Sequence, residues 1–174
     1  YKGENGIDNL NLIMQDFFNP KDESKKEITY GYVTYREHDK VLQQINNPDC
    51  NVFNGDIGYI EKIDTVLKPR KKDVITINFE GNMVEYSKED LSMIKHAYAI
   101  TIHKSQGSEF PHVFIPICHS YNKMLYNKLI YTGVSRAKKS LIVLGEKQSF
   151  INAIENDYST NRQTGLKKKI LHNL

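Results

Sequence analysis

The sequence predicts an α/β fold with a small β-barrel inserted into it. Short strand patterns, separated by turn residues, cluster between residues 58 and 86. Patterns of helices and buried strands lie on both sides of that cluster. A chain of 174 residues, 39% hydrophobic and 26% charged, has the length of one substantial domain and the composition of a globular protein.

The segment before the barrel is expected to contain one helix and two strands. Asp8 can cap a helix that ends at Asn19 and Pro20, because proline cannot continue it. The apolar face of this helix consists of Leu10, Ile13, Met14, Phe17 and Phe18. Alternating residues predict a strand over 29–35, and a shorter strand is expected over 40–45.

The barrel is predicted from three short strand patterns, over 58–64, 74–79 and 83–86. The last two flank the sequence Glu-Gly-Asn at 80–82, which is typical of a hairpin connection. Three short strands within about forty residues favour a small barrel over a layered sheet. The predicted division of the chain is 1–57, 58–95 for the barrel, and 96–174.

After the barrel the α/β pattern returns. Buried strands are expected over 97–102 and 112–118, and a helix over 122–137. The apolar run at 140–145 is typical of a strand that is covered on both faces. The last residues, 166–174, are expected to form another helix.

Two polar clusters accompany these apolar runs. In AYAITIHKSQGSEFPHVFIPIC, residues 97–118, polar side chains crowd around Gly107, which permits close backbone approach to a ligand. In KLIYTGVSRAKKSLIVLGE, residues 128–146, Arg136 ends a helical pattern, and a guanidinium there can fork onto phosphate oxygens. No G-x-x-x-x-G-K-[ST] phosphate loop occurs in the sequence. The residues therefore predict one half of a nucleotide site.

Each cluster also has a purely structural interpretation. Arg136 alone can complement the negative end of a helix, and the polar residues around Gly107 can form an ordinary turn. The joint occurrence of both clusters favours a binding role. Between the barrel strands, the cations Arg70, Lys71 and Lys72 can contact DNA phosphates, but a solvated loop tip is the alternative.

Composition limits the other possibilities. A net charge of +3 permits nucleic-acid binding without arguing for it. Cys50 and Cys118 lack the spacing of a metal site, so we expect no metal ligands, and reduced thiols are favoured over a single disulfide. No apolar stretch approaches the roughly 20 residues of a membrane span, which favours a soluble, cytoplasmic protein. Because the sequence opens on Tyr1 without methionine, we expect a fragment of a longer protein.

The two clusters resemble motifs V and VI of superfamily 1 DNA helicases. The resemblance is strongest to the RecD-like branch, the exodeoxyribonuclease V alpha-chain family, and looser to UvrD-type enzymes. Similar strings in that branch correspond to YKGENGIDNLN, VFNGDIG and NRQTGLKKKIL of this chain. One departure is His38, where the family often has glycine before Asp39. A glycine would permit a tight turn, so His38 implies a different local backbone.

The resemblance implies a RecA-like parallel-sheet domain of the P-loop-NTPase type, lacking the phosphate loop, with an inserted SH3-like β-barrel. In the family, two RecA-like domains clamp ATP, and this chain is similar to the second. The first domain supplies the phosphate loop and the magnesium-binding acid. ATP and Mg²⁺ are therefore expected to be held mostly by that domain, and no cofactor is expected in this chain alone.

The resemblance also implies roles for individual residues. Arg136 would reach the γ-phosphate as the catalytic cation. The residues that would face the nucleotide are Gln106, Gly107 and Glu109. The residues that would touch single-stranded DNA are Thr101, His103, Lys104 and Ser105.

The function implied is that of a C-terminal motor-domain fragment of an ATP-dependent DNA helicase. Such a protein couples ATP hydrolysis to 5′ to 3′ translocation on single-stranded DNA and to unwinding. The expected partners are single-stranded DNA and the first RecA-like domain, and the fragment alone is expected to be inactive. The alternative is a stand-alone module, derived from a helicase, that binds nucleic acid or protein without ATPase activity.

Overall fold

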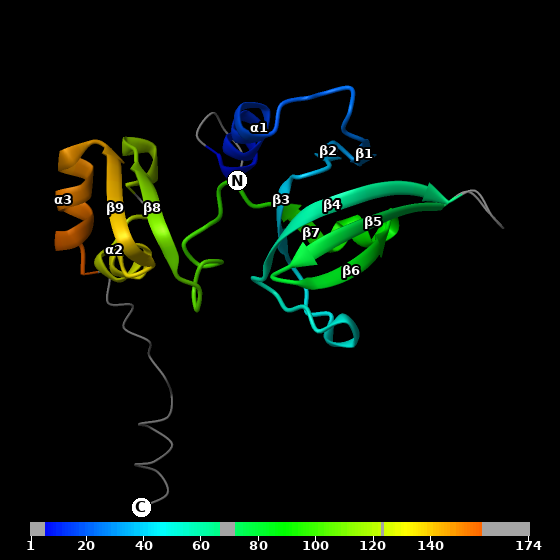
Figure 1. Cartoon of the computed structure of the whole chain (residues 1–174). Helices are drawn as coiled ribbons and strands as arrows, with labels where there is room; N and C mark the ends of the chain where they lie inside the picture. The colour runs from blue at the N-terminus through cyan, green and yellow to red at the C-terminus, as the bar shows by residue number, and fades with distance from the viewer. Residues whose placement is uncertain (1–5, 67–71, 123, 158–174) are drawn as a thin grey trace, which may run out of the picture. The chain divides into compact units, whose positions relative to one another are not determined.

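The computed structural model describes residues 6–66, 72–122 and 124–157. The chain divides into two compact units, Tyr1–Ser105 and Gln106–Leu174, and each is described by itself (Figure 1). Arg70, Lys71 and the helix expected over 166–174 lie outside the described residues. No helix among the described residues is long and apolar enough to cross a membrane.

The first unit is built on a five-stranded antiparallel sheet with strand order β6-β5-β4-β3-β7 (Figure 1). Its strands are β3 (Lys40–Gln43), β4 (Ile57–Val66), β5 (Lys72–Phe79), β6 (Asn82–Ser87) and β7 (Ile94–His96). Two short 3-10 helices, η1 (Pro48–Cys50) and η2 (Glu89–Met93), lie in the connections. The predicted strands over 40–45, 58–64, 74–79 and 83–86 are confirmed. The sheet extends beyond 58–95 at both ends, and the domain boundaries at 57/58 and 95/96 stay predictions.

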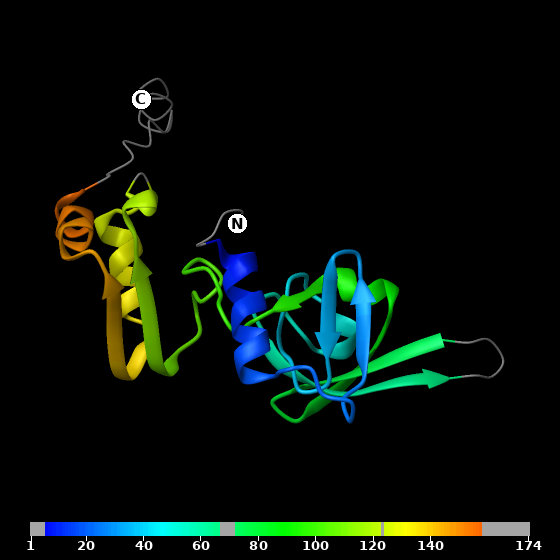
Figure 2. The same cartoon turned by 90° about the horizontal axis from the view of Figure 1, so that it is seen from above.

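The strand expected over 29–35 is wrong, because the chain reverses there. β1 (Glu27–Tyr30) and β2 (Val33–Arg36) form a hairpin, with Gly31 at φ +60° in the turn (Figure 2). Glycine adopts this conformation at little cost, whereas most residues avoid it. Alternation alone could not distinguish one strand from two short strands around that turn.

The core of the first unit lies between this hairpin and the sheet. Ile28 of β1 and Tyr35 of β2 are buried with the inward-facing residues of β3, β4, β5 and β6. On β5 and β6 the apolar members of the core come from alternate positions, as expected for a sheet with one buried face, whereas Ile60 and Ile63 of β4 are separated by a β-bulge. The core includes Val41, Ile60, Ile63, Ile75, Ile77, Phe79, Val84 and Tyr86.

α1 (Ile7–Phe18) confirms the predicted helix, but Gly6 and not Asp8 is its N-cap residue. Its buried residues are the polar Asn11 and Gln15, whereas Phe17 is 76% exposed. The apolar face that the sequence shows is therefore not the buried face of this helix within the first unit. Polar side chains occupy the buried face because they meet a buried carboxylate and main-chain groups.

That carboxylate belongs to Asp39, which is fully buried. Its two oxygens accept hydrogen bonds from Gln15 Nε2 at 2.6 Å, Asn19 Nδ2 at 2.7 Å, the Arg36 N–H at 2.7 Å, Tyr98 Oη at 2.9 Å and His96 Nε2 at 3.1 Å. Burial by itself raises the pKa of Asp39. The hydrogen bond from His96, and those from the main chain and Asn19, outweigh burial and hold that pKa below its ordinary value. A buried charge is tolerated here because every side of it is hydrogen-bonded.

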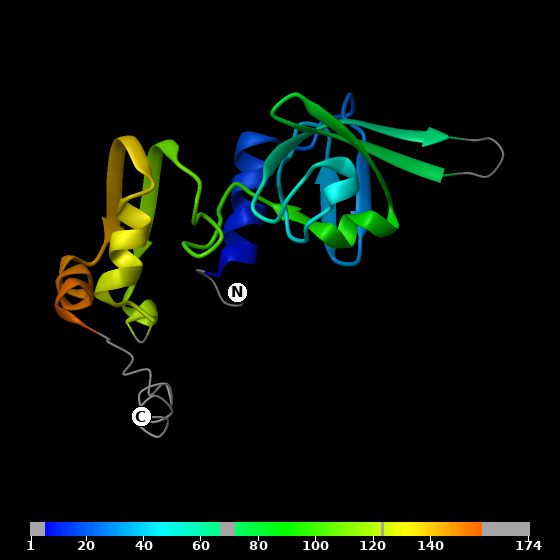
Figure 3. The ribbon, with the colours of Figure 1, turned by 90° about the horizontal axis from the view of Figure 1, so that it is seen from below.

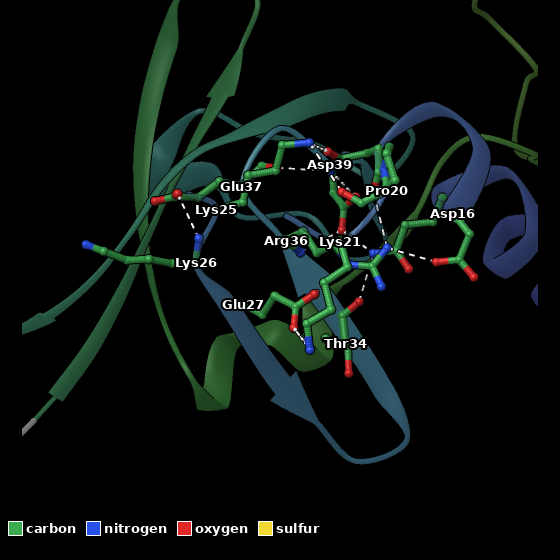
Figure 4. A network of polar contacts seen from close by, with 12 residues as sticks. Asp16, Pro20, Lys21, Lys25, Lys26, Glu27, Thr34, Arg36, Glu37 and Asp39 are labelled. Carbon is green, nitrogen blue, oxygen red and sulfur yellow. Dashed lines mark hydrogen bonds and ion pairs between the residues drawn. The ribbon is translucent and has the colours of Figure 1, made fainter. Parts of the chain in front are cut away.

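The turn before β3 corrects the expectation for His38. Its φ is +73°, the left-handed conformation that a glycine would adopt, so histidine does not impose a different backbone. The N–H of His38 donates to the Ile60 carbonyl at 2.7 Å, which holds the turn against β4. Figure 4 shows the surrounding polar network, in which Arg36 pairs with Asp16 at 2.9 Å and Glu27 at 2.6 Å.

The strand expected over 97–102 is also wrong, since these residues have no strand partner. The amide of Asn11 takes the place of one: its Nδ2 donates to the Ala99 carbonyl, and its Oδ1 accepts from the Ala99 N–H, both at 2.9 Å. Both main-chain groups of Ala99 are thereby satisfied without a sheet. The segment is held against the unit by side chains and by one main-chain bond, from the Ala97 N–H to the Lys40 carbonyl at 2.8 Å.

The second unit is a parallel pair of strands covered by helices on one face. β8 (Phe110–Ile117) confirms the strand predicted over 112–118, and β9 (Ala137–Gly145) confirms the one over 140–145. Between them are η3 (His119–Tyr121) and α2 (Asn127–Val134), and α3 (Lys147–Glu155) follows β9 (Figure 3). α2 is shorter than the helix predicted over 122–137. The covered face contains Ile115, Ile117, Leu125, Ile130 and Ala153.

The expectation that β9 is covered on both faces is wrong within the second unit, because side chains on one of its faces are exposed. Ile142 is 43% exposed and Leu144 is 51% exposed, and Phe114, which pairs with Ile142 on β8, is 62% exposed. Both helices pack on the opposite face, so one face of this parallel pair lies open.

Candidate nucleotide and nucleic-acid site

Arg136 lies between the end of α2 and the start of β9, as the sequence predicts, and its guanidinium is half-buried. Nε donates to the Thr132 carbonyl at 3.1 Å, Nη1 donates to the Ser108 carbonyl at 3.1 Å, and Nη2 donates to Ser135 Oγ at 3.0 Å. The bond to Thr132 reaches a carbonyl in the last turn of α2, so Arg136 does complement that helix end. The bond to Ser108 adds a second role, because it ties the loop before β8 to α2.

The guanidinium retains donors for a ligand. Arginine has five N–H groups, and three of them are used by Thr132, Ser108 and Ser135. The remaining groups are on Nη1 and Nη2, the two atoms that fork onto an oxyanion. Ser135 Oγ in turn donates to the Thr132 carbonyl at 3.0 Å, which fixes its acceptor side toward Arg136. The arginine is therefore oriented before any ligand arrives.

The predicted nucleotide-facing residues precede β8 in the same unit. Gln106 and Gly107 are exposed, and Gly107 has φ +87° with no atom within 4 Å of the position its Cβ would take. Glycine is thus required there by the backbone conformation and not by crowding. Glu109 is paired with Lys138, whose Nζ lies 2.8 Å from its carboxylate. The hydrogen bond from Lys138, together with its charge, lowers the pKa of Glu109.

The predicted DNA-contacting residues form one compact turn at the end of the first unit. The Ser105 N–H donates to the Thr101 carbonyl at 3.1 Å, and Ser105 Oγ donates to the Ile102 carbonyl at 2.8 Å. Thr101 Oγ1 accepts from the Lys104 N–H at 3.2 Å. The hydroxyls of Thr101 and Ser105 therefore shape the turn, while His103 is exposed.

Lys104 joins this turn to the barrel. Its Nζ donates to Asn54 Oδ1 at 2.6 Å, and the Asn54 N–H donates to Asn46 Oδ1 at 2.8 Å. Gly55, at φ +106°, continues the turn, as an Asn-Gly sequence commonly does. The string VFNGDIG is thus in contact with the turn formed by residues 101–105, although Asn54 and Lys104 are 50 positions apart in the sequence.

Sequence reasoning missed three members of these clusters. No site role was predicted for Ser135, Lys138 or Asn54. The partners of Lys138 and Asn54 come from other segments, so spacing gave no signal for them, whereas Ser135 bonds the adjacent Arg136. Lys72 begins β5, and its side chain is outside the described atoms. Among the described residues, no group of three His, Cys, Asp or Glu side chains is placed to hold a metal ion.

Comparison with known families matches both halves of the chain. Residues 10–79 match the SH3 domain of ATP-dependent RecD-like DNA helicases, and residues 96–144 match the UvrD-like helicase C-terminal domain. Among solved structures, the Pif1 helicase from Bacteroides in complex with ADP-AlF3 and ssDNA superposes with a TM-score of 0.57. That match covers 99% of this chain and 47% of the other at 15% identity, so it supports the fold alone.

Curated relatives are similar over most of the chain. The ATP-dependent RecD2 DNA helicase of Deinococcus radiodurans is 32% identical over 149 residues, which are 86% of this chain and 19% of that protein. The RecBCD enzyme subunit RecD of Haemophilus influenzae is 43% identical over 123 residues, 71% of this chain and 17% of that protein. This chain thus spans about a fifth of the length of these relatives. The predicted fold class, a RecA-like α/β domain with an SH3-like barrel, is confirmed, and the chain belongs to the RecD-like helicase family.

Proposed function

We propose that this chain is the C-terminal motor portion of an ATP-dependent RecD-like DNA helicase. The whole protein would couple ATP hydrolysis to 5′ to 3′ movement along single-stranded DNA and to strand separation. Its first RecA-like domain would supply the phosphate loop and the acid that binds Mg²⁺. A reducing cytoplasm is the compartment that suits the free thiols of Cys50 and Cys118.

The observation that carries this proposal is the position of Arg136. Its guanidinium is oriented by Thr132, Ser135 and Ser108, yet two N–H groups on Nη1 and Nη2 are left to bind an oxyanion. ATP supplies a phosphoryl group on which charge develops during transfer, and a fixed guanidinium stabilises such charge. Nη1 also donates to the Ser108 carbonyl. A movement of Arg136 on nucleotide binding or hydrolysis would therefore shift the loop before β8.

The nucleotide-facing residues fit this role in different ways. Gly107 exposes main-chain groups, and Gln106 offers a free-standing amide on an exposed turn. Glu109 can accept from ribose hydroxyls only by sharing or leaving Lys138. An exposed pair of this kind is weak because solvent screens it, so a nucleotide can displace it at little cost.

Replacing Arg136 by alanine in a protein of the relatives' full length tests the proposal. We expect ATPase activity stimulated by single-stranded DNA to fall by about a thousandfold or more, because an arginine that stabilises the transferred phosphoryl contributes about that much. Single-stranded DNA binding should change little. Lys139→Ala, which removes a neighbouring exposed cation, is the control and should retain activity. Unchanged ATPase activity in Arg136→Ala would remove this residue from the site.

A second measurement tests whether ATP hydrolysis requires the first RecA-like domain. Residues 1–174 alone should not hydrolyse ATP, since they lack a phosphate loop. Robust hydrolysis by this chain would contradict the proposal. Binding of nucleic acid by a naturally separate 174-residue protein without any motor partner would instead favour the stand-alone module.

A further inference from the structure

The outward face of the five-stranded sheet carries one continuous row of large side chains. In the sheet register, Lys40 of β3 pairs with Tyr59 of β4, Tyr59 pairs with Asn78 of β5, and Asn78 pairs with Met83 of β6. Directly paired residues have Cβ atoms about 5 Å apart, so the four side chains are consecutive neighbours. Successive residues of a strand point to opposite faces, which fixes the side on which this row lies.

The row points away from the core. The adjoining positions Val41, Ile60 and Ile77 belong to the buried cluster, whereas Tyr59 is 50% exposed and Met83 is 51% exposed. A tyrosine and a methionine that are half-exposed on the strands of this sheet offer a rigid apolar surface. Surfaces of this kind accept flat aromatic rings at low entropic cost, because the strands already fix the side chains.

Lys40 gives this surface a positive end. Its side chain is half-buried, and no acidic side chain among the described residues forms an ion pair with it. Burial lowers the pKa of the Lys40 ammonium, and no neighbouring carboxylate offsets that effect. A cation placed in this way gains more from an incoming anion than a fully solvated lysine does.

The next row along the sheet does not have this character. A β-bulge between Ile60 and Lys62 separates it, and it pairs Lys62 with Thr76 and Thr76 with Glu85. Lys62 is also bonded to Asp64 at 2.6 Å. That row is balanced in charge, so the unpaired cation and the exposed aromatic ring occur together only in the row from Lys40 to Met83 among the described strands.

We propose that the row Lys40–Tyr59–Asn78–Met83 binds single-stranded nucleic acid as a stacking platform. Tyr59 stacks on an unpaired base, Met83 packs beside it, and Lys40 contacts a phosphate. This inference rests on the proposed function, and it adds a contact on the barrel to those of the turn at 101–105. Complementary charge and the flat aromatic surface together favour a nucleic-acid strand over an apolar protein surface.

Asn78 gives the platform a fixed polar group. Its Oδ1 accepts from the Gly81 N–H at 2.7 Å, which orients the amide. Because Asn78 pairs with Tyr59 in the register, its amide lies on the same face of the sheet as the Tyr59 ring. This arrangement favours bases with exposed acceptors without imposing a strict sequence, as is usual for single-strand binding.

The test measures binding of the 174-residue chain to a fluorescein-labelled oligo(dT) by anisotropy at several salt concentrations. Tyr59→Ala should weaken binding by about five- to a hundredfold, because one base–aromatic stack contributes about that factor. Tyr59→Phe should retain affinity. Lys40→Gln should reduce the salt slope by about 0.7, the value for one phosphate contact on a single strand.

Tyr32→Ala is the matched control, because Tyr32 is a fully exposed tyrosine elsewhere in the same unit. Thermal melting of every variant shows whether the fold is retained. If the chain binds oligo(dT) and Tyr59→Ala binds equally well, the platform is excluded while the DNA-binding part of the proposed function stands. Equal binding of a blunt duplex would also exclude stacking. If the unaltered chain binds no DNA at all, both the platform and that part of the proposed function fail.

Discussion

Nε2 of His96 lies 3.1 Å from Oδ2 of Asp39, and both side chains are buried in the first unit. His96 ends β7 and Asp39 precedes β3, so this contact closes the sheet where the segment 97–105 leaves it. The same carboxylate accepts from Gln15 and Asn19 and so holds α1 in place. One acidic residue therefore joins the helix, the sheet and the start of the turn at 101–105.

Asp39→Asn should reduce the free energy of unfolding by about 3 kcal/mol, since it replaces a buried acceptor with an amide facing other donors. Urea unfolding at pH 7 measures the change. Asp49→Asn, at an exposed carboxylate, is the control and should alter stability by less than about 0.5 kcal/mol. A loss at Asp39 no larger than that of the control would show that the carboxylate is dispensable.

The same residue predicts acid sensitivity. The pKa of Asp39 is lower in the folded protein than its ordinary value of 3.8, so its contribution is complete above that value. The contribution is lost as the pH falls below 3.8 and the folded carboxyl takes up a proton. Unfolding free energies measured from pH 6 downward should therefore fall more steeply below pH 4 in the unaltered chain than in Asp39→Asn. Parallel curves would contradict this assignment.

Tyr86 predicts a loss of stability at alkaline pH. Burial raises its pKa from 10.0 to about 12, and its hydroxyl donates to Gln43 Oε1 at 3.0 Å. A raised pKa means that the stabilisation is complete below pH 10 and is lost as the pH rises toward 12. Tyr86→Phe should lower the free energy of unfolding at pH 7. In this variant that free energy should also decrease less between pH 10 and pH 12. Tyr32→Phe, at an exposed site, should leave the profile unchanged, and an equal flattening there would refute the role of Tyr86.

His38→Gly should stabilise the first unit. The φ of +73° costs a non-glycine residue about 1–2 kcal/mol, and glycine regains most of that despite its greater freedom when unfolded. We expect a net gain of about 0.5–1 kcal/mol, seen as a higher melting temperature. Lys88→Gly, at φ −59°, should be neutral or destabilising. A fall in melting temperature for His38→Gly would show that the imidazole itself stabilises the turn.

Gly145 predicts a severe packing defect. Its φ is +121°, and a Cβ there would lie 2.0 Å from the Ile117 carbonyl oxygen, which is main chain and cannot move aside. Gly145→Ala should destabilise the second unit by more than about 3 kcal/mol in urea unfolding. Gly107→Ala is the control that distinguishes backbone strain from a steric clash. Gly107 also has a positive φ, +87°, but a Cβ there would meet no atom within 4 Å. This substitution should cost about 1–2 kcal/mol, and equal effects at the two positions would argue against the contact.

Hydrophobic periodicity located α1 but did not identify the face that is buried in the first unit. The spacing of Ile13 and Phe17 is that of a packing face, and the residues that do pack, Asn11 and Gln15, share the same helical spacing. Polar residues can replace apolar ones on a buried face only when specific partners exist. The partner carboxylate, Asp39, is 24 residues beyond Gln15, and no local pattern signals that contact.

The membership of the candidate site stays a prediction from the sequence, and the bonding among its residues could not be predicted. Arg136, Gly107 and Glu109 were identified from residue type and motif, and their order along the chain fixed their place beside α2 and β8. That Lys138 would pair with Glu109 depends on the register of two parallel strands, whereas the bond from Arg136 to Ser135 depends on how the end of α2 turns into β9. Register is set by packing across the whole sheet, which short motifs do not encode.

The hydrogen bond between Lys104 and Asn54 has a mechanical consequence. A strand of DNA pulling on the turn at 101–105 would load that bond directly, and the Asn11 clamp on Ala99 would share the tension. The force would then spread into β3 through the Gly55 N–H, which donates to the Gln43 carbonyl at 3.0 Å. If the proposed function holds, the barrel would act as a stiff anchor for the DNA strand, so that a translocation step would not be absorbed by deformation of the turn.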